Sequence, residues 1–201
     1  IRYRDVTGVQ TCALPIFSHI RRLAVAGDRV ALTDGRVIEL ISAADAAAPQ
    51  RLSGVESAGF VFDLTAVPGE VYAACGGAGV QALRMDSLAP DATVATPGPA
   101  TALALVSNLL TVACGPGGWL TLNVDNAAAP VPVLSTPGSV TFEAAAAGSR
   151  VALTDGARAA DVMNLTAPLA PVLEASFTNL TAALRLRGVA ALIVAAEDEA
   201  G

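Results

Sequence analysis

The sequence predicts an all-β protein built from repeated units of about 40 residues. The first observation is that residues 30–35, Val-Ala-Leu-Thr-Asp-Gly, recur letter for letter at 151–156. Degraded copies lie at 71–76 and 110–115, and a fainter one lies at 191–196. Because the copies keep one spacing of about 40 residues, the chain is expected to repeat a single structural unit.

The second observation is a set of turn residues that keeps the same period. Prolines end the turns at Pro49, Pro90, Pro130 and Pro171, and Asp or Asn stands a few residues before the first three of them. Short Asp and Asn side chains bond nearby backbone amides, and proline fixes φ. Glycine precedes each new unit in the same phase, at Gly59, Gly98 and Gly138.

The third observation is the pattern of strands and turns within one unit. In the second unit we predict strands at 60–67, 70–75, 80–85 and 92–95, separated by turns rich in Gly, Pro and Asp. Short strands at about ten-residue spacing are typical of antiparallel β structure. The alanine run at 144–147 favours a helix by propensity alone, but the repeat assigns it to a strand, so tertiary context should override propensity.

Four short antiparallel strands per unit of about 40 residues form the blade of a β-propeller. With 53% hydrophobic residues, both faces of each blade can be covered by neighbouring blades. We predict a β-propeller fragment of about four blades plus part of a fifth, with an incomplete ring and an uncovered blade face at each end. A β-solenoid is the competing architecture, although its coils are usually shorter. The predicted blades are 18–59, 60–98, 99–138, 139–179 and a partial 180–201.

The first seventeen residues are set aside. Residues 6–16 look like the translation of a sequencing-library adapter, and such scars are excluded from fold reasoning. We expect residues 1–17 to be artefactual or disordered and the native N-terminus to be missing.

Composition and motifs exclude several functions. A net charge of -6 without a basic run argues against a nucleic-acid partner. No apolar run is long enough to span a bilayer, so no transmembrane segment is predicted. His19 is the one histidine, which leaves no residue for a Ser-His-Asp triad or a histidine-ligated metal. No catalytic residue, cofactor or metal site is predicted. Cys75 and Cys114 are interpreted as buried apolar thiols, and Asp34 and Asp155 as turn residues.

Four residues are candidate ligand-binding residues. Arg22 and Asp63 fall in the first strand of their units, which in a propeller lines the axial channel, and the third unit has Ala102 there. Glu143 takes the same place if the fourth unit has one extra residue in its first hairpin. These side chains either converge on a ligand or cation or simply make the channel polar. Trp119 lies beside a glycine turn, where it either contacts a ligand or packs between blades.

The stretch 118–130, Gly-Trp-Leu-Thr-Leu-Asn-Val-Asp-Asn-Ala-Ala-Ala-Pro, is similar in register to the LVIVD repeat. Residues 79–90 look like the same motif shortened by one residue, and 24–35 resemble the part that precedes it. The chain departs from the pattern at Ala46 and Ala127, where the repeat has proline, and at Ala167, where it has Asp or Asn. The resemblance implies a bacterial or archaeal propeller that is exported or displayed at the cell surface, without an assigned activity.

Two functions follow as expectations. The first is a non-enzymatic binding or scaffold propeller, extracytoplasmic, that engages protein or polysaccharide through one face of the ring. The alternative is a propeller enzyme of the hydrolase or quinoprotein type, whose axial metal or cofactor site would be completed by blades outside this sequence.

Overall fold

The structure is a computed structural model that describes residues 19–155, 159–167, 170–178, 184–189 and 192–197. The adapter-like segment and the rest of residues 1–17 lie outside the described residues. Across the described residues every regular element is a β-strand.

The chain forms four successive four-stranded antiparallel sheets and a two-stranded one, each a simple meander in sequence order. We call each four-stranded sheet a blade. The strands of the four blades are β1 (Arg22–Ala26), β2 (Arg29–Thr33), β3 (Val37–Ser42) and β4 (Gln50–Glu56); β5 (Asp63–Val67), β6 (Glu70–Ala74), β7 (Val80–Arg84) and β8 (Pro90–Val94); β9 (Ala102–Val106), β10 (Leu109–Ala113), β11 (Trp119–Asn123) and β12 (Val131–Thr136); β13 (Glu143–Ala147), β14 (Arg150–Thr154), β15 (Ala160–Asn164) and β16 (Val172–Phe177). The two-stranded sheet pairs β17 (Leu184–Val189) with β18 (Leu192–Glu197).

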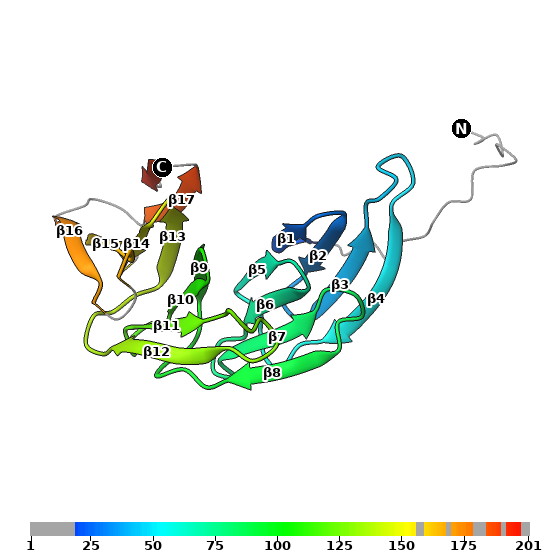
Figure 1. The fold of residues 1–201 in the computed structure, drawn as a ribbon, viewed down its shortest axis with the longest axis horizontal. Coiled ribbons are helices and arrows are strands. Elements are labelled where there is room, and N and C mark those ends of the chain that lie inside the picture. The colour runs from blue at the N-terminus through cyan, green and yellow to red at the C-terminus, as the bar shows by residue number, and fades with distance from the viewer. Residues whose placement is uncertain (1–18, 156–158, 168–169, 179–183, 190–191, 198–201) are drawn as a thin grey trace, which may run out of the picture.

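Successive blades pack through their first strands. β1 contacts β5, β5 contacts β9, β9 contacts β13, and β13 contacts β17. In the described part of the chain the sheets follow one another along an arc that does not close into a ring (Figure 1). The first strands are thus the innermost strands of the arc, as in the predicted channel.

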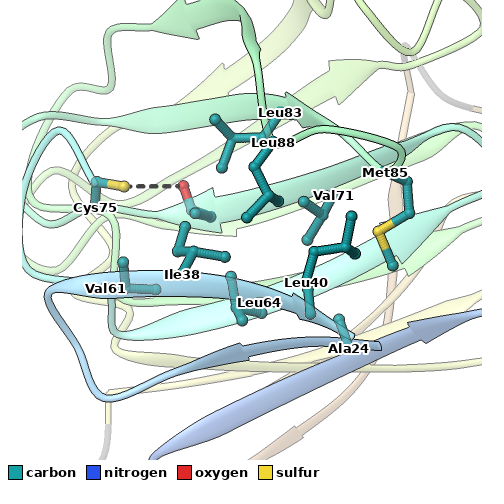
Figure 2. Packing of buried hydrophobic residues seen from close by; sticks show 12 residues of the cluster. Ala24, Ile38, Leu40, Val61, Leu64, Val71, Cys75, Leu83, Met85 and Leu88 are labelled. Carbon is teal, nitrogen blue, oxygen red and sulfur yellow. Dashed lines mark hydrogen bonds between the residues drawn. The ribbon is translucent and has the colours of Figure 1, made fainter. Parts of the chain in front are cut away.

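The hydrophobic core lies between blades. Ile38 and Leu40 of the first blade pack against Leu64, Val71 and Leu83 of the second, as Figure 2 shows. Two further clusters join the second blade to the third and the third to the fourth. Burying apolar surface contributes roughly 25 cal/mol per Å². Most of that burial is between blades, so one blade alone has little to stabilise it.

The outward face of the first blade is not covered. Leu23 on β1 is 58% exposed and Val25 is 56% exposed. The residues at the position of Leu23 in the next three blades are Leu64, Leu103 and Ala144, and they are 6%, 7% and 7% exposed. Those three residues pack against a preceding blade, whereas none of the described residues forms a blade before Leu23. The uncovered face predicted for an incomplete ring is therefore present at this end of the arc.

The glycine of the repeated stretch joins each blade to the next. The backbone oxygen of Gly35 accepts a hydrogen bond from Val61 N at 2.7 Å. Gly76 and Ala100 exchange two backbone hydrogen bonds at 3.1 and 2.9 Å. Gly115 exchanges two at 2.7 and 2.9 Å with the corresponding residue of the fourth blade, Thr141. The three glycines have φ of 106°, 57° and 54°, a region that glycine enters readily. This inter-blade contact gives a physical reason for the repeat, while Gly156 lies outside the described residues.

Candidate functional site

Arg22, Asp63 and Glu143 occupy the same position in three innermost strands. Each is the first residue of its strand, and they face Thr33, Ala74 and Thr154 of the second strands. Ala102 holds this position in β9. The structure therefore places the three predicted residues at one end of the channel-lining strands.

Asp63 connects three blades. Its Oδ1 accepts a hydrogen bond from its neighbour Leu64 N at 3.0 Å and lies 3.4 Å from Nε of Arg22 on β1. Its Oδ2 accepts a hydrogen bond from Leu103 N on β9 at 2.9 Å. Both carboxylate oxygens are thus engaged by the protein itself. The main role of Asp63 is therefore to connect neighbouring blades.

Burial is the main influence on the Asp63 carboxyl and raises its pKa above the usual range. The amide of Leu103, the charge of Arg22 and the amide of Leu64 oppose this shift, in that order. The negative charge of Glu143 raises the pKa further, so the two carboxyl groups are near enough to repel each other. The three side chains form one electrostatic group at the first positions of the innermost strands.

Trp119 lies elsewhere. It is buried at the start of β11 and belongs to the cluster between the third and fourth blades, with Ala113 and Leu153. It also lines a separate hollow of about 480 Å³ with residues of the fourth blade, including Thr141 and Asp161. Of the four candidate residues, the structure brings together Arg22, Asp63 and Glu143 but not Trp119.

A group of aromatic residues that was not predicted from the sequence lies beside Arg22 and Glu143. Phe60, Phe62 and Phe142 are 39%, 41% and 41% exposed. They line a hollow of about 590 Å³. We call it the aromatic hollow; its lining residues are Arg21, Arg22, Phe60, Val61, Phe62, Pro99, Thr101, Phe142 and Glu143. One signal was available: these are three of the five phenylalanines in the chain, and Phe62 and Phe142 directly precede Asp63 and Glu143.

Ring contacts hold part of this group in place. The rings of Phe60 and Phe62 meet edge to face, with centroids 5.0 Å apart and planes at 64°. The guanidinium carbon of Arg21 lies 5.4 Å from the centroid of Phe60. Edge-to-face pairs and cations over rings both add attraction beyond simple burial.

The inter-blade glycines leave space for the three rings. A Cβ on Gly35 would lie 2.6 Å from Phe60, one on Gly76 would lie 3.0 Å from Phe62, and one on Gly115 would lie 3.3 Å from Phe142. A side chain at the first two positions would push the ring away. The glycine turns that join the blades therefore also lie directly against these three rings.

The remaining motifs have structural roles. Asp34 Oδ1 accepts hydrogen bonds from Arg36 N and Val37 N at 2.8 and 2.9 Å, and these amides, that of Val37 first, lower its pKa. Asp155 Oδ1 accepts one from Ala159 N at 3.0 Å. Both aspartates thus close turns, as predicted.

The two cysteines of the repeat are buried and free, in agreement with the interpretation as apolar thiols. Sγ of Cys75 contacts the oxygen of Ala73, drawn dashed in Figure 2. Burial raises the pKa of Cys114 to about 11, which keeps this thiol protonated at neutral pH.

Comparison with solved structures identifies the architecture. The β-propeller domain of Myceliophteria thermophila Cps50 (Swd1) is similar with a TM-score of 0.63 and 14% identity, over 80% of this chain and 58% of that one. The fold is that of a β-propeller. The computationally designed Ika8 protein is similar at TM-score 0.68 and 13% identity, over 89% of this chain and 55% of its own. The designed Ika4 protein gives 0.60 and 16%, over 73% and 91%.

This chain thus spans somewhat more than half the length of the first two similar structures. No protein-family model and no curated protein sequence matches it. The likeness confirms the predicted fold class.

Two features are absent from the described residues. They contain no group of three or more His, Cys, Asp or Glu side chains placed to hold a metal ion. Within the same residues, no helix has the length and apolar character needed to cross a membrane.

Proposed function

We propose that the protein is a non-enzymatic binding propeller that engages a protein partner through the face bearing the aromatic hollow. The observation that carries this proposal is the group of three partly exposed phenylalanines, Phe60, Phe62 and Phe142, around one hollow beside the first residues of the innermost strands. Grouped exposed apolar side chains mark interaction sites more often than scattered ones do.

The composition of this face supports a protein partner. Aromatic residues and arginine are enriched at the centres of protein interfaces, and the hollow combines three phenylalanines with Arg21 and Arg22. The glycine turns and the contact between Phe60 and Phe62 hold rings in place before a partner arrives. Such preorganisation reduces the entropy lost on binding.

The enzyme alternative receives less support. It needs polar side chains of the innermost strands to be free for a metal, cofactor or substrate. Asp63 has both oxygens engaged, by Leu64, Arg22 and Leu103, and Ala102 contributes no polar group. A binding role does not need these polar side chains to be free, because the rings and arginines that line the hollow can contact a partner directly.

Family membership and location belong to the same proposal. The motifs at 79–90 and 118–130 support an LVIVD-type propeller, and that resemblance in turn supports an extracytoplasmic or cell-surface location. Fractionation of the native host cells, with detection of this protein in each fraction, tests the location. Recovery of the protein only from the cytoplasmic fraction would contradict it.

The binding proposal is tested by comparing phenylalanine variants. Phe62→Ser combined with Phe142→Ser removes two rings from the hollow, and Phe177→Ser removes a comparably exposed ring from the outermost strand β16 as a matched control. In cross-linking capture from the native host, partners lost with the double variant but retained with the control support the proposal. Equal capture by all three proteins would contradict it.

A further inference from the structure

We propose that the aromatic hollow takes an extended peptide segment in which an acidic side chain stands next to an aromatic or aliphatic one. This specifies the partner of the same face and rests on the proposed function.

Arg21 is the residue that would recognise the acid. Its backbone N–H donates to Thr33 O at 2.8 Å, which fixes the residue just before β1. Its guanidinium lies over Phe60, 5.4 Å from the ring centroid, and forms no ion pair with any described residue. A guanidinium stacked on a ring keeps its N–H groups in its own plane, where they can donate two parallel hydrogen bonds to a carboxylate.

The charge around the hollow differs from that of the whole chain. The net charge of the chain is -6, yet Arg21 and Arg22 line the hollow and Arg187 lines the adjoining one. The charge of Asp63 is met by Arg22, and Glu143 is the other carboxylate of the lining. Arg187 bonds the oxygen of Leu186 and, like Arg21, forms no ion pair within the described residues. The linings of the two hollows thus hold three guanidinium groups against two carboxylates, and this excess of positive charge favours an acidic partner.

The shape favours a peptide over a small molecule. The aromatic hollow of about 590 Å³ and the adjoining hollow of about 350 Å³ share Arg21 and Arg22 in their linings. A ligand can therefore lie across both. An apolar side chain would sit against Phe62 and Phe142, its acidic neighbour would meet Arg21, and a second acid further along would approach Arg187.

The test is a selection of random peptides displayed on phage against the immobilised chain, held at low density to limit self-association. The peptide most enriched is then synthesised with a fluorescein label, and its Kd is measured by fluorescence anisotropy. We expect enriched peptides to combine Asp or Glu with a neighbouring aromatic or aliphatic residue. Their affinity should fall as salt concentration rises, because the ionic contacts are exposed.

Matched variants assign the contacts. Arg21→Gln should raise the Kd of the peptide roughly tenfold, because a charge-assisted pair is lost. Arg21→Lys should lose part of that affinity, since lysine keeps the charge but not the planar fork. Phe142→Ser should also weaken binding roughly tenfold. Arg29→Gln and Phe177→Ser, which change residues outside the hollow, should leave Kd within roughly twofold of the wild-type value. Equal melting temperatures would show that the variants remain folded.

Three results would overturn the inference. In the first, the enriched peptides lack acidic residues, and their affinity falls with Phe142→Ser but not with Arg21→Gln. This result would contradict an acidic partner and leave the proposed binding face intact. No enrichment, or affinity unchanged in every hollow variant, would remove both the inference and the proposed function. Heparin binding that is lost with Arg21→Gln, without any peptide enrichment, would replace the peptide by an anionic polysaccharide.

Discussion

Asp63 and Leu103 join two neighbouring blades, because Oδ2 of Asp63 accepts a hydrogen bond from the backbone N–H of Leu103 at 2.9 Å. The N–H lies on the innermost strand β9 and forms this bond with the side chain of the preceding blade. The same carboxylate also faces Arg22 of the first blade. One side chain thus binds three successive units in a protein whose stability depends on contacts between units.

Replacing Asp63 should therefore lower the free energy of unfolding. Asp63→Ala leaves the Leu103 amide and Arg22 without their partner, and we expect a loss of roughly 2 kcal/mol in the free energy of unfolding. Asp63→Asn keeps an acceptor for the amide and, because burial disfavours the charged carboxylate, should cost less than Asp63→Ala. Urea unfolding followed by fluorescence and circular dichroism measures both. An Asp63→Ala protein as stable as the wild type would show that the contacts of Asp63 with Leu103 and Arg22 do not contribute to stability.

Gly98, in the segment that connects β8 to β9, lies close to the turn between β10 and β11, and we predict that no side chain fits there. A Cβ at this position would lie 2.2 Å from Cys114 O and 2.9 Å from Gly117 N, both backbone atoms. Gly98→Ala should cost roughly 2 kcal/mol or more, because the backbone must shift.

Gly77→Ala is the matched control for that change. A Cβ at Gly77 would meet no atom within 4 Å, and its φ is not in the positive region. This variant should be neutral or slightly stabilising, since alanine restricts the unfolded chain. Thermal melts compare the two. A similar melting temperature for both variants would contradict the predicted contact at Gly98.

The repeat made the fold predictable because its landmarks are local. Turn glycines, aspartates and prolines act within a few residues, so their period reveals the unit without any knowledge of packing. The alanine run at 144–147 lies within β13, as the repeat predicted against propensity. The predicted strand 60–67 was too long at its start. β5 begins at Asp63 because residues before it bond the preceding blade, with Val61 N donating to Gly35 O.

The site was only partly predictable. The equivalent strand positions of Arg22, Asp63 and Glu143 were predictable because the period of the repeat aligns these residues. The aromatic hollow was missed because Phe60 belongs to a connecting segment and Phe142 to another unit, and only the packing of blades brings them together. The second role of Asp63, its bond to Leu103, likewise depends on the distance between blades, which no sequence spacing states.

Glu70 should make stability depend on pH. It begins β6, is buried, and its pKa is raised to about 7, first by burial and then by the hydrogen bond with Asp91 and the negative charge of Asp91. Arg84, which donates to both oxygens of Asp91, opposes the shift. The folded pKa lies above the unfolded value near 4.5, so folding takes up a proton between these values. Stability contributed by the protonated form is therefore lost as pH rises from about 4.5 through about 7.

Glu70→Gln is the variant that checks this dependence. Glutamine stays neutral, so the variant should exceed the wild type in stability by roughly 1 kcal/mol at pH 8 and differ less at pH 5. Melting temperatures at the two values measure the difference. A wild type and variant whose stabilities change in parallel between pH 5 and 8 would exclude Glu70 as the titrating group.

The uncovered first blade should make the chain self-associate. Leu23 and Val25 expose an apolar face whose counterpart is buried between blades elsewhere, and exposed faces of this kind promote association. Leu23→Asn combined with Val25→Asn removes the apolar groups, while Ala24, which packs on the second blade, is unchanged. We expect the wild type to form larger species with rising concentration and the double variant to shift towards monomer. Sedimentation velocity over a concentration series measures this.

Leu52 supplies the control for that experiment, because it is an exposed leucine on the outer strand β4 rather than on the first strand. If association depends on the blade face, Leu52→Asn should associate as the wild type does. If all three proteins associate equally, the surface responsible lies elsewhere. A wild type that stays monomeric with a cooperative melt would show that the first blade tolerates exposure of this face, which would contradict the view that each blade depends on a neighbour to cover it.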